Sequence, residues 1–212
     1  MMRPNKAISG LYAVTPDSDD TAALLAMTEA AIAGGARLVQ YRHKTAGTVL
    51  RRAQAVALLE LCRRHDTLFI VNDHVELAVE IGAPGVHIGR DDGLLQSARA
   101  RLGPGVVIGV SCYREMARAR AAAQDGADYI AFGGFYPSRV KPGAGGASPS
   151  LLTEARALGL PVVAIGGITP DNAPSLIDAG ADAVAVITAL YAAPDVEAAA
   201  RRFSNLFESI NS

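Results

Sequence analysis

Short runs of β-branched and other apolar residues recur along the whole chain, and stretches with helical spacing separate most of them. Apolar runs of this length, bounded by turn residues, are typical of strands that are buried on both faces. We count eight such runs, at residues 8–14, 38–41, 68–71, 85–88, 106–110, 129–132, 161–165 and 183–187.

The intervening stretches are rich in Ala, Leu and Arg, and glycines follow several of them, as expected at helix ends. Eight strands that alternate with helices favour an α/β fold of one closed (β/α)8 TIM barrel, spanning 1–212 as a single catalytic domain, over a doubly wound sheet. The predicted helices cover 20–33, 48–65, 75–81, 93–101, 114–124, 150–157 and 170–179, and a last helix closes the chain.

Polar residues gather where the predicted strands end, which is where α/β barrels place their active sites. The second strand leads into Gln40-Tyr41-Arg42-His43-Lys44. Gln40, Arg42 and Lys44 share one parity, so they face the barrel interior if the strand persists that far. A guanidinium and an ammonium directed inward suit a diphosphate, although a solvated basic strand end is the alternative.

Carboxylates follow the third and fourth predicted strands. Asp73 comes after Asn72, and Asp92 comes after Asp91. Two carboxylates on neighbouring strands could bind one Mg²⁺ and leave positions for water and diphosphate oxygens. Asp73 and Asp92 could instead cap the helices that begin next to them, and the residues alone do not decide between Asp91 and Asp92.

Glycines mark two further segments. Gly166-Gly167 follows the seventh strand and precedes a predicted helix near Pro170, which matches the usual phosphate-binding place of this fold. The irregular stretch 133–147 is rich in Gly and Pro, and we interpret it as a hinged lid. It lacks the strand-loop-helix context of a dinucleotide fingerprint and the Lys-Ser/Thr ending of a P-loop.

Charge and composition narrow the function classes. Lys and Arg number 20 against 21 for Asp and Glu, so no overall field favours nucleic acid or a membrane surface. The N-terminal residues 1–6 are polar and lack an apolar signal core, and no run approaches the length of a membrane span. We expect a cytoplasmic protein that acts on small molecules and can form a homo-oligomer. Cys62 and Cys112 have no metal-binding spacing and are expected to be reduced, and Ser111 lacks the surroundings of a nucleophile.

In barrel order, these residues resemble the motifs of the thiamine phosphate synthase family along essentially the whole chain. The family's Gln-x-Arg-x-Lys, Asn-Asp and Val-His-Leu-Gly segments correspond to 40–44, to 72–73 and to 86–89. The resemblance implies that residues 40–44, Asn72, Ser111 and Lys141 bind an aminopyrimidine diphosphate. It further implies a catalytic set of Arg42, Lys44, Ser111 and Lys141, and a Mg²⁺ held by Asp73 and Asp92, which selects Asp92 over Asp91.

The other half of the implied site departs from the family at one position. The family's Pro-Thr-x-Thr-Lys corresponds to 137–141, where Val140 has lost a hydroxyl. The resemblance implies that the thiazole phosphate is bound by Ser138, Arg139, Val140, Gly167, Ile187 and Thr188.

The resemblance implies a transferase that joins 4-amino-2-methyl-5-(diphosphomethyl)pyrimidine to a (carboxy)thiazole phosphate and releases diphosphate. A thiazole tautomerase of the same fold is the nearest alternative. It should not need the diphosphate and metal residues, and a Cys-Tyr pair rather than a histidine follows Ser111. A noncatalytic sensor of phosphate or of the thiamine pathway would keep the Gly166-Gly167 segment but release no diphosphate.

Overall fold

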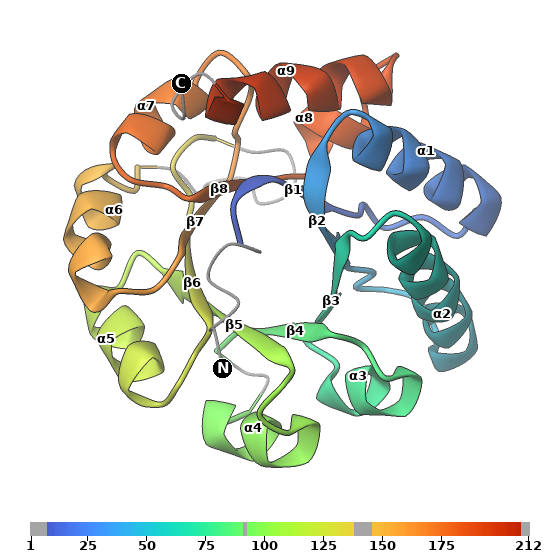
Figure 1. The fold of residues 1–212 in the computed structure, drawn as a ribbon, viewed down its shortest axis with the longest axis horizontal. Coiled ribbons are helices and arrows are strands. Elements are labelled where there is room, and N and C mark those ends of the chain that lie inside the picture. The colour runs from blue at the N-terminus through green and yellow to red at the C-terminus, as the bar shows by residue number, and fades with distance from the viewer. Residues whose placement is uncertain (1–7, 91–92, 138–145, 209–212) are drawn as a thin grey trace.

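Eight parallel strands form a closed barrel in the computed structural model, which describes residues 8–90, 93–137 and 146–208 (Figure 1). Each strand pairs with its sequence neighbours, and β1 also pairs with β8, so the sheet has no free edge. The strands are β1 (Gly10–Val14), β2 (Ala36–Tyr41), β3 (Leu68–Asn72), β4 (Gly85–Ile88), β5 (Val107–Tyr113), β6 (Tyr129–Gly133), β7 (Val162–Ile165) and β8 (Ala183–Val186). The predicted barrel is confirmed.

Helices surround the barrel in the order in which they follow the strands (Figure 1). They are α1 (Thr21–Ala33), α2 (Thr48–Arg64), α3 (Val75–Ile81), α4 (Leu95–Leu102), α5 (Met116–Gln124), α6 (Ser150–Ala155) with a 3-10 turn (Arg156–Leu158), α7 (Ala173–Asp178), α8 (Thr188–Tyr191) and α9 (Val196–Glu208). The short α8 was not predicted. No helix among the described residues is long and apolar enough to cross a membrane.

Several predicted bounds differ from the structure. β5 continues to Tyr113, so Ser111 lies within the strand and not after it. Two expected helix starts move inward, to Leu95 for α4 and to Ala173 for α7. The N-cap of α4 is Leu94 and that of α3 is His74, so neither Asp92 nor Asp73 is the helix cap considered above.

The apolar residues form two separate clusters because strand side chains alternate between the two faces of the sheet. One fills the barrel interior and includes Tyr12, Leu38, Ile70, Val107 and Tyr129. The other, larger cluster lies between the sheet and the helices. The interior is therefore a packed core, and an active site in this fold is expected at the end of the barrel where the strands finish.

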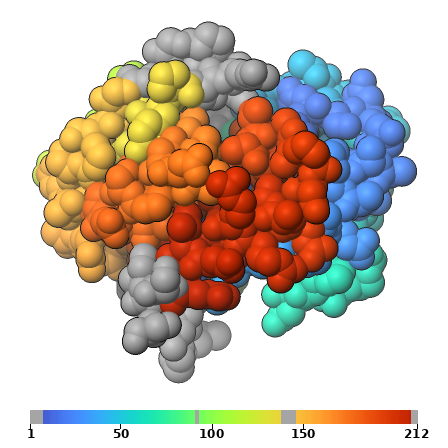
Figure 2. Space-filling view, turned by 90° about the horizontal axis from the view of Figure 1, so that it is seen from above, coloured from blue at the N-terminus to red at the C-terminus, as the bar shows by residue number. Residues whose placement is uncertain are grey.

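The last helix packs against the first and completes the outer wall. Gly34 ends α1 so close to α9 that a Cβ atom at this position would lie 2.4 Å from the Glu197 carbonyl oxygen. Figure 2 shows this wall from outside, with the orange and red C-terminal helices beside the blue N-terminal segment. Cys62 and Cys112 are buried.

Candidate active site

Gln40 and Ser111 point into the barrel from β2 and β5. Gln40 is buried, and its Nε2 donates a 2.8 Å hydrogen bond to the Tyr12 hydroxyl inside the barrel. Ser111 is partly buried, and its Oγ lies 2.8 Å from Nε2 of the buried His87. The parity argument thus holds for Gln40. It does not extend to Lys44, because β2 ends at Tyr41.

Hydrogen bonds from the segment after β1 fix the segment that follows β2. The Thr15 hydroxyl accepts a 2.8 Å hydrogen bond from the Arg42 amide and donates one of 3.0 Å to the Arg42 carbonyl. Asp17 accepts hydrogen bonds from the Arg42 guanidinium at 2.8 Å and from the Lys44 amide at 3.2 Å. Thr15 and Asp17 therefore hold the Arg42 backbone and guanidinium and the Lys44 backbone. Neither was predicted, because only strand pairing brings them there.

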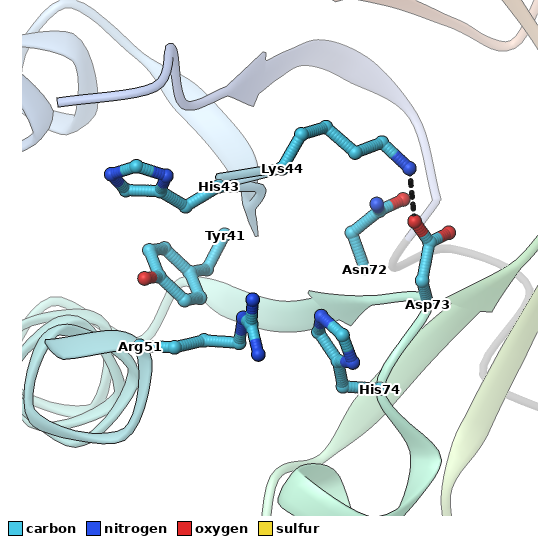
Figure 3. A pocket seen from close by; sticks show the side chains of 7 residues that line it. All are labelled: Tyr41, His43, Lys44, Arg51, Asn72, Asp73 and His74. Atoms are coloured by element: carbon cyan, nitrogen blue, oxygen red, sulfur yellow. Dashed lines mark hydrogen bonds and ion pairs between the residues drawn. The ribbon is translucent and has the colours of Figure 1, made fainter. Parts of the chain in front are cut away.

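Asp73 sits in a strained turn directly after β3. Its φ is +64°, and the His74 amide donates a 2.8 Å hydrogen bond across it to the Asn72 carbonyl, which closes a γ-turn. Strained backbone of this kind in a non-glycine residue collects at functional sites. The Asp73 carboxylate also forms an ion pair with Lys44 (Figure 3). The predicted metal ligand and one predicted diphosphate ligand are thus in contact.

A cavity of about 260 Å³ lies between the ends of β2 and β3 and the start of α2. Its lining residues are Tyr41, His43, Lys44, Arg51, Asn72, Asp73 and His74 (Figure 3). All but Arg51 and His74 were predicted. A larger hollow of about 740 Å³ lies where the strands begin, at the end of the barrel opposite to these residues. The smaller cavity is the candidate site because it contains the convergent charges.

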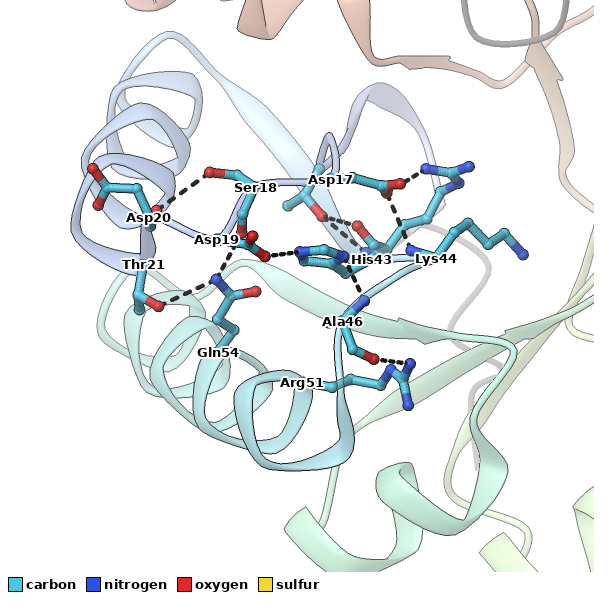
Figure 4. A network of polar contacts seen from close by, with 12 residues as sticks. Asp17, Ser18, Asp19, Asp20, Thr21, His43, Lys44, Ala46, Arg51 and Gln54 are labelled. Atoms are coloured by element: carbon cyan, nitrogen blue, oxygen red, sulfur yellow. Dashed lines mark hydrogen bonds and ion pairs between the residues drawn. The ribbon is translucent and has the colours of Figure 1, made fainter.

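Two of the lining residues already have protein partners that face α2. The Tyr41 hydroxyl donates to Gln54 at 2.9 Å, and His43 Nδ1 accepts from the Ala46 amide at 3.0 Å. His43 Nε2 lies 3.3 Å from the Asp19 carboxylate (Figure 4). The Tyr41 hydroxyl and His43 Nδ1 are engaged, whereas His43 Nε2, although near Asp19, is buried and has no hydrogen-bond partner among the described residues. Tyr41 and His43 can therefore shape the cavity wall.

Arg51 is a third cation at this cavity, and sequence reasoning missed it. Its guanidinium donates to the Ala46 carbonyl, while its buried Nε has no hydrogen-bond partner among the described residues. A cation near the N-terminus of α2 interacts unfavourably with the helix dipole. This unfavourable placement was visible in the sequence and could have marked Arg51 as a candidate for ligand binding. Burial, and then the charge of Arg51, lowers the pKa of the neighbouring His74.

The buried His87 should make the protein's stability depend on pH. Burial lowers the pKa of His87 from 6.5 to about 4, against a smaller opposing effect of Asp73. The unfolded chain binds this proton below pH 6.5 and the folded chain only near pH 4. The free energy of unfolding should therefore fall as pH drops through this window, by roughly 3 kcal/mol in total.

Urea unfolding at several pH values between 7 and 5 measures this effect. The His87→Gln variant should show a shallower pH dependence than the unaltered chain. His65→Gln, which alters an exposed histidine at the end of α2, is the matched control. An equal dependence in the unaltered chain and in His87→Gln would assign the effect to other groups.

The segments after β7 and β8 lie at the same end of the barrel. Gly166 and Gly167 have φ values of +109° and +66°, and a Cβ atom at Gly167 would lie 2.4 Å from the Pro137 carbonyl oxygen. The Asn172 side chain closes this turn by donating to the Gly167 carbonyl and accepting from the Thr169 amide. Ile187 and Thr188 lead from β8 into α8. The backbone conformation and close packing of this turn therefore require glycines whether or not a phosphate binds there.

The remaining predicted residues lie outside the described part of the chain. They are Asp92 with its competitor Asp91, most of the expected lid, and Ser138, Arg139, Val140 and Lys141. Among the described residues, no three His, Cys, Asp or Glu side chains are grouped to hold a metal. Asp73 nevertheless fits the described half of a Mg²⁺ site, because Mg²⁺ is commonly held by one or two carboxylates together with substrate phosphates.

Comparison with known proteins places this chain in a family. The family model described as thiamine monophosphate synthase matches residues 11–190. The chain belongs to the thiamine monophosphate synthase family. Two members are the thiamine-phosphate synthases of Methylobacillus flagellatus, 56% identical over 94% of this chain and 96% of that protein, and of Chromobacterium violaceum, 55% identical over 94% and 97%. The resemblance inferred from the motifs is confirmed.

Solved structures agree with this assignment to the thiamine monophosphate synthase family. The thiamine phosphate pyrophosphorylase from Pyrococcus furiosus superposes with a TM-score of 0.87 at 31% identity, over 98% of this chain and 99% of that one. Orotidine 5'-phosphate decarboxylase from Pyrococcus horikoshii OT3 superposes with a TM-score of 0.68 at 14% identity, over 92% and 99%. The second similarity reflects the barrel fold alone.

Proposed function

We propose that this chain is a transferase that condenses 4-amino-2-methyl-5-(diphosphomethyl)pyrimidine with a (carboxy)thiazole phosphate, giving thiamine phosphate and diphosphate. Family membership supports the reaction. The observation that carries it at the level of residues is the cavity at the ends of β2 and β3, where Lys44 and Arg51 meet Asp73 and Asn72. A cavity lined by convergent cations is suited to a polyanion.

The diphosphate is bound by Arg42, Lys44 and, from outside the described residues, Lys141. Arg42 is held at the site by its backbone bonds to Thr15 and by its ion pair with Asp17. Asp17 is a carboxylate that an incoming diphosphate can replace as the partner of the guanidinium. Gln40, Asn72 and Ser111 bind the pyrimidine half, and Tyr41 and His43 support the wall.

Asp73 and Asp92 would hold Mg²⁺, which would supply positive charge to neutralise the leaving diphosphate. The ion pair of Lys44 with Asp73 keeps a cation beside this carboxylate. Charge on the diphosphate would be met by the ammonium and guanidinium groups that already line the site.

The thiazole phosphate is bound by Gly167, Ile187 and Thr188, together with Ser138, Arg139 and Val140. Support comes from the placement of the first three residues at the ends of β7 and β8, the usual phosphate position in this fold. Val140 supplies only its backbone to such a contact.

The reaction breaks the carbon-oxygen bond between the pyrimidine methylene and diphosphate and forms a carbon-nitrogen bond to the thiazole nitrogen. The electron pair of the broken bond leaves with diphosphate, and the nitrogen lone pair makes the new bond, so no covalent enzyme intermediate is needed. We infer a dissociative substitution, because an electron-rich aminopyrimidine stabilises positive charge at the methylene. Electron-withdrawing substituents on the pyrimidine should then slow the reaction steeply.

One assay separates this function from its two rivals. Purified protein is mixed with Mg²⁺ and both substrates, and thiamine phosphate and released diphosphate are measured. A synthase forms both products in equal amounts. A tautomerase changes only the thiazole phosphate, and a sensor forms no product. The absence of both products with folded protein would overturn the proposal.

The choice of Asp92 over Asp91 gives a sharper prediction. Asp92→Ala should lower kcat/KM by roughly a hundredfold and raise the Mg²⁺ concentration needed for half-maximal rate, because a metal-binding carboxylate is lost. Asp91→Ala is the matched control and should lower kcat/KM far less. Equal losses in the two variants would mean that the second metal ligand has been assigned to the wrong residue.

We also propose that the enzyme acts in the cytoplasm and forms a homo-oligomer. Sedimentation of the purified chain tests the second point.

A further inference from the structure

A chain of hydrogen bonds crosses the barrel interior from β2 to β5, on opposite sides of the barrel (Figure 1). It begins at Gln40, whose Nε2 donates to the Tyr12 hydroxyl at 2.8 Å. The Tyr12 and Tyr129 hydroxyl oxygens are 2.9 Å apart. Tyr129 then contacts His87 Nδ1 at 2.9 Å, and His87 Nε2 contacts Ser111 Oγ at 2.8 Å. The two ends are residues assigned to the pyrimidine, and the three middle residues have no assigned role.

The middle residues are shut off from solvent. Tyr12 is 1% exposed, Tyr129 0% and His87 6%. Their rings also support one another, since Tyr12 meets Tyr129 edge to face at 6.2 Å and His87 stacks on Tyr129 at 5.5 Å. Burial favours the uncharged forms, because it raises the pKa of both phenols and lowers that of the imidazole. Each link is therefore a bond between neutral groups.

Counting hydrogens gives this chain a direction. The Gln40 amide nitrogen can only donate, so the Tyr12 hydroxyl accepts and sends its single hydrogen to Tyr129. Tyr129 must then donate its own hydrogen to His87 Nδ1. A neutral imidazole that accepts at Nδ1 carries its proton on Nε2.

The direction fixes what the two ends offer to a ligand. His87 Nε2–H donates to Ser111 Oγ, so the Ser111 hydroxyl keeps its hydrogen for another acceptor. Gln40 turns its amide nitrogen to Tyr12, and its Oε1 has no hydrogen-bond partner among residues that the structure describes. The site therefore presents a hydroxyl donor at one end of the chain and a carbonyl acceptor at the other.

We propose that Tyr12, Tyr129 and His87 are positioning residues that orient Gln40 as an acceptor and Ser111 as a donor toward the aminopyrimidine. The inference rests on the proposed function for the identity of the ligand. An aminopyrimidine carries the complementary groups, an exocyclic amine that donates and ring nitrogens that accept. A site with fixed hydrogen-bond direction discriminates strongly against ligands of the wrong pattern, because a mismatch leaves buried polar groups unpaired.

Gly109 provides the space that this arrangement needs. It lies on β5 beside Tyr129, and a Cβ atom there would lie 1.9 Å from Cζ of the Tyr129 ring. Gly85, on β4, is the matched interior position, since its Cβ atom would lie 2.2 Å from the Ile70 side chain and touch no member of the chain. Alanine at Gly109 must displace the Tyr129 ring, whereas alanine at Gly85 displaces the Ile70 methyl and comes within 3.3 Å of the Phe69 and Val107 carbonyl oxygens.

The first test determines the tautomer of His87 in the substrate-free full chain by ¹⁵N NMR at neutral pH. The direction of the chain predicts a neutral ring protonated on Nε2. Gly109→Ala should alter this signal, and Gly85→Ala should leave it in place. A ring protonated on Nδ1, or a charged ring, would overturn the proposal whatever the enzyme's activity.

The second test uses a double-mutant cycle. Tyr129→Phe should raise KM for the pyrimidine diphosphate by about tenfold and leave KM for the thiazole phosphate within about twofold. In a Ser111→Ala background the same change should cost less than about twofold, because the oriented hydroxyl is already gone. Tyr191→Phe is the control, since it removes a buried hydroxyl that contacts Thr28 in the helix layer.

If the increase in KM in the double variant equals the product of the increases in the two single variants, Tyr129 does not act through Ser111. That result would overturn the proposal. If Tyr129→Phe does not fold, Gly109→Ala replaces it in the cycle, with Gly85→Ala as its control. The two proposals fail separately. A protein that forms no thiamine phosphate but has the Nε2-protonated His87 would contradict the proposed function and leave the oriented chain intact.

Discussion

Replacing Asp73 by asparagine should lower kcat/KM by about a thousandfold while the protein keeps its stability. The loss is electrostatic, because removal of one preorganised charged group from a site that stabilises a developing anion costs about a hundredfold to a thousandfold. Mg²⁺ dependence should shift in the same variant, since an amide is a weaker ligand for this cation than a carboxylate.

The fold should tolerate this change for a conformational reason. Asp73 has a φ of +64°, a region that asparagine enters more readily than most other residues. Asparagine is also nearly isosteric with aspartate, so the γ-turn between Asn72 and His74 can persist. The substitution therefore separates the charge of Asp73 from its backbone conformation.

Asp66→Asn is the matched control for this experiment. Asp66 also has a positive φ, of +51°, but it follows α2 at the opposite end of the barrel. Steady-state kinetics and urea unfolding of both variants should give a large kinetic loss for Asp73 alone and similar stability for the two. Nearly full activity in Asp73→Asn would remove this carboxylate from the metal site.

Replacing Gly167 by alanine should lower the free energy of unfolding by about 3 kcal/mol and raise KM for the thiazole phosphate. Two costs add. A positive φ of +66° costs an L-residue about 1–2 kcal/mol. A Cβ atom 2.4 Å from the Pro137 carbonyl oxygen also forces the backbone after β6 and β7 apart, at about 1–3 kcal/mol.

Gly82→Ala isolates the first of these costs. Gly82 has a φ of +64° at the end of α3, and a Cβ atom there meets nothing within 4 Å. Chemical unfolding of both variants gives the steric cost as the difference between them, and KM for the thiazole phosphate should change only in Gly167→Ala. Equal destabilisation of the two variants would contradict the close approach of the Tyr136-Pro137 backbone to Gly167.

The alternation of apolar runs and helical stretches predicted the barrel correctly because both signals are local. A buried strand needs apolar residues on both faces, and its covering helix needs an apolar stripe, whatever the rest of the chain does. Segment ends were less accurate. The extension of β5 to Tyr113 depends on pairing with β6, which the sequence of β5 alone does not report.

For the candidate site residues, the sequence predicted which residues lie at the strand ends but not how their side chains are oriented. Asn72 and Asp73 were expected near the mouth because parallel strands finish at one end of the barrel. Which way each side chain turns was not predictable beyond the last paired residue. Tyr41 and His43 turn to Gln54 and to Asp19, and this depends on the approach of α2 and of the segment after β1.

Local patterns and motif order are enough to predict the fold class, the family and the set of polar residues at the strand ends. How those residues combine depends on the three-dimensional fold. It joined Gln40 to Ser111 through Tyr12, Tyr129 and His87, and it placed Arg51 at the cavity. The physical reason is closure of the barrel, which brings side chains from distant strands within hydrogen-bonding distance in a space without solvent.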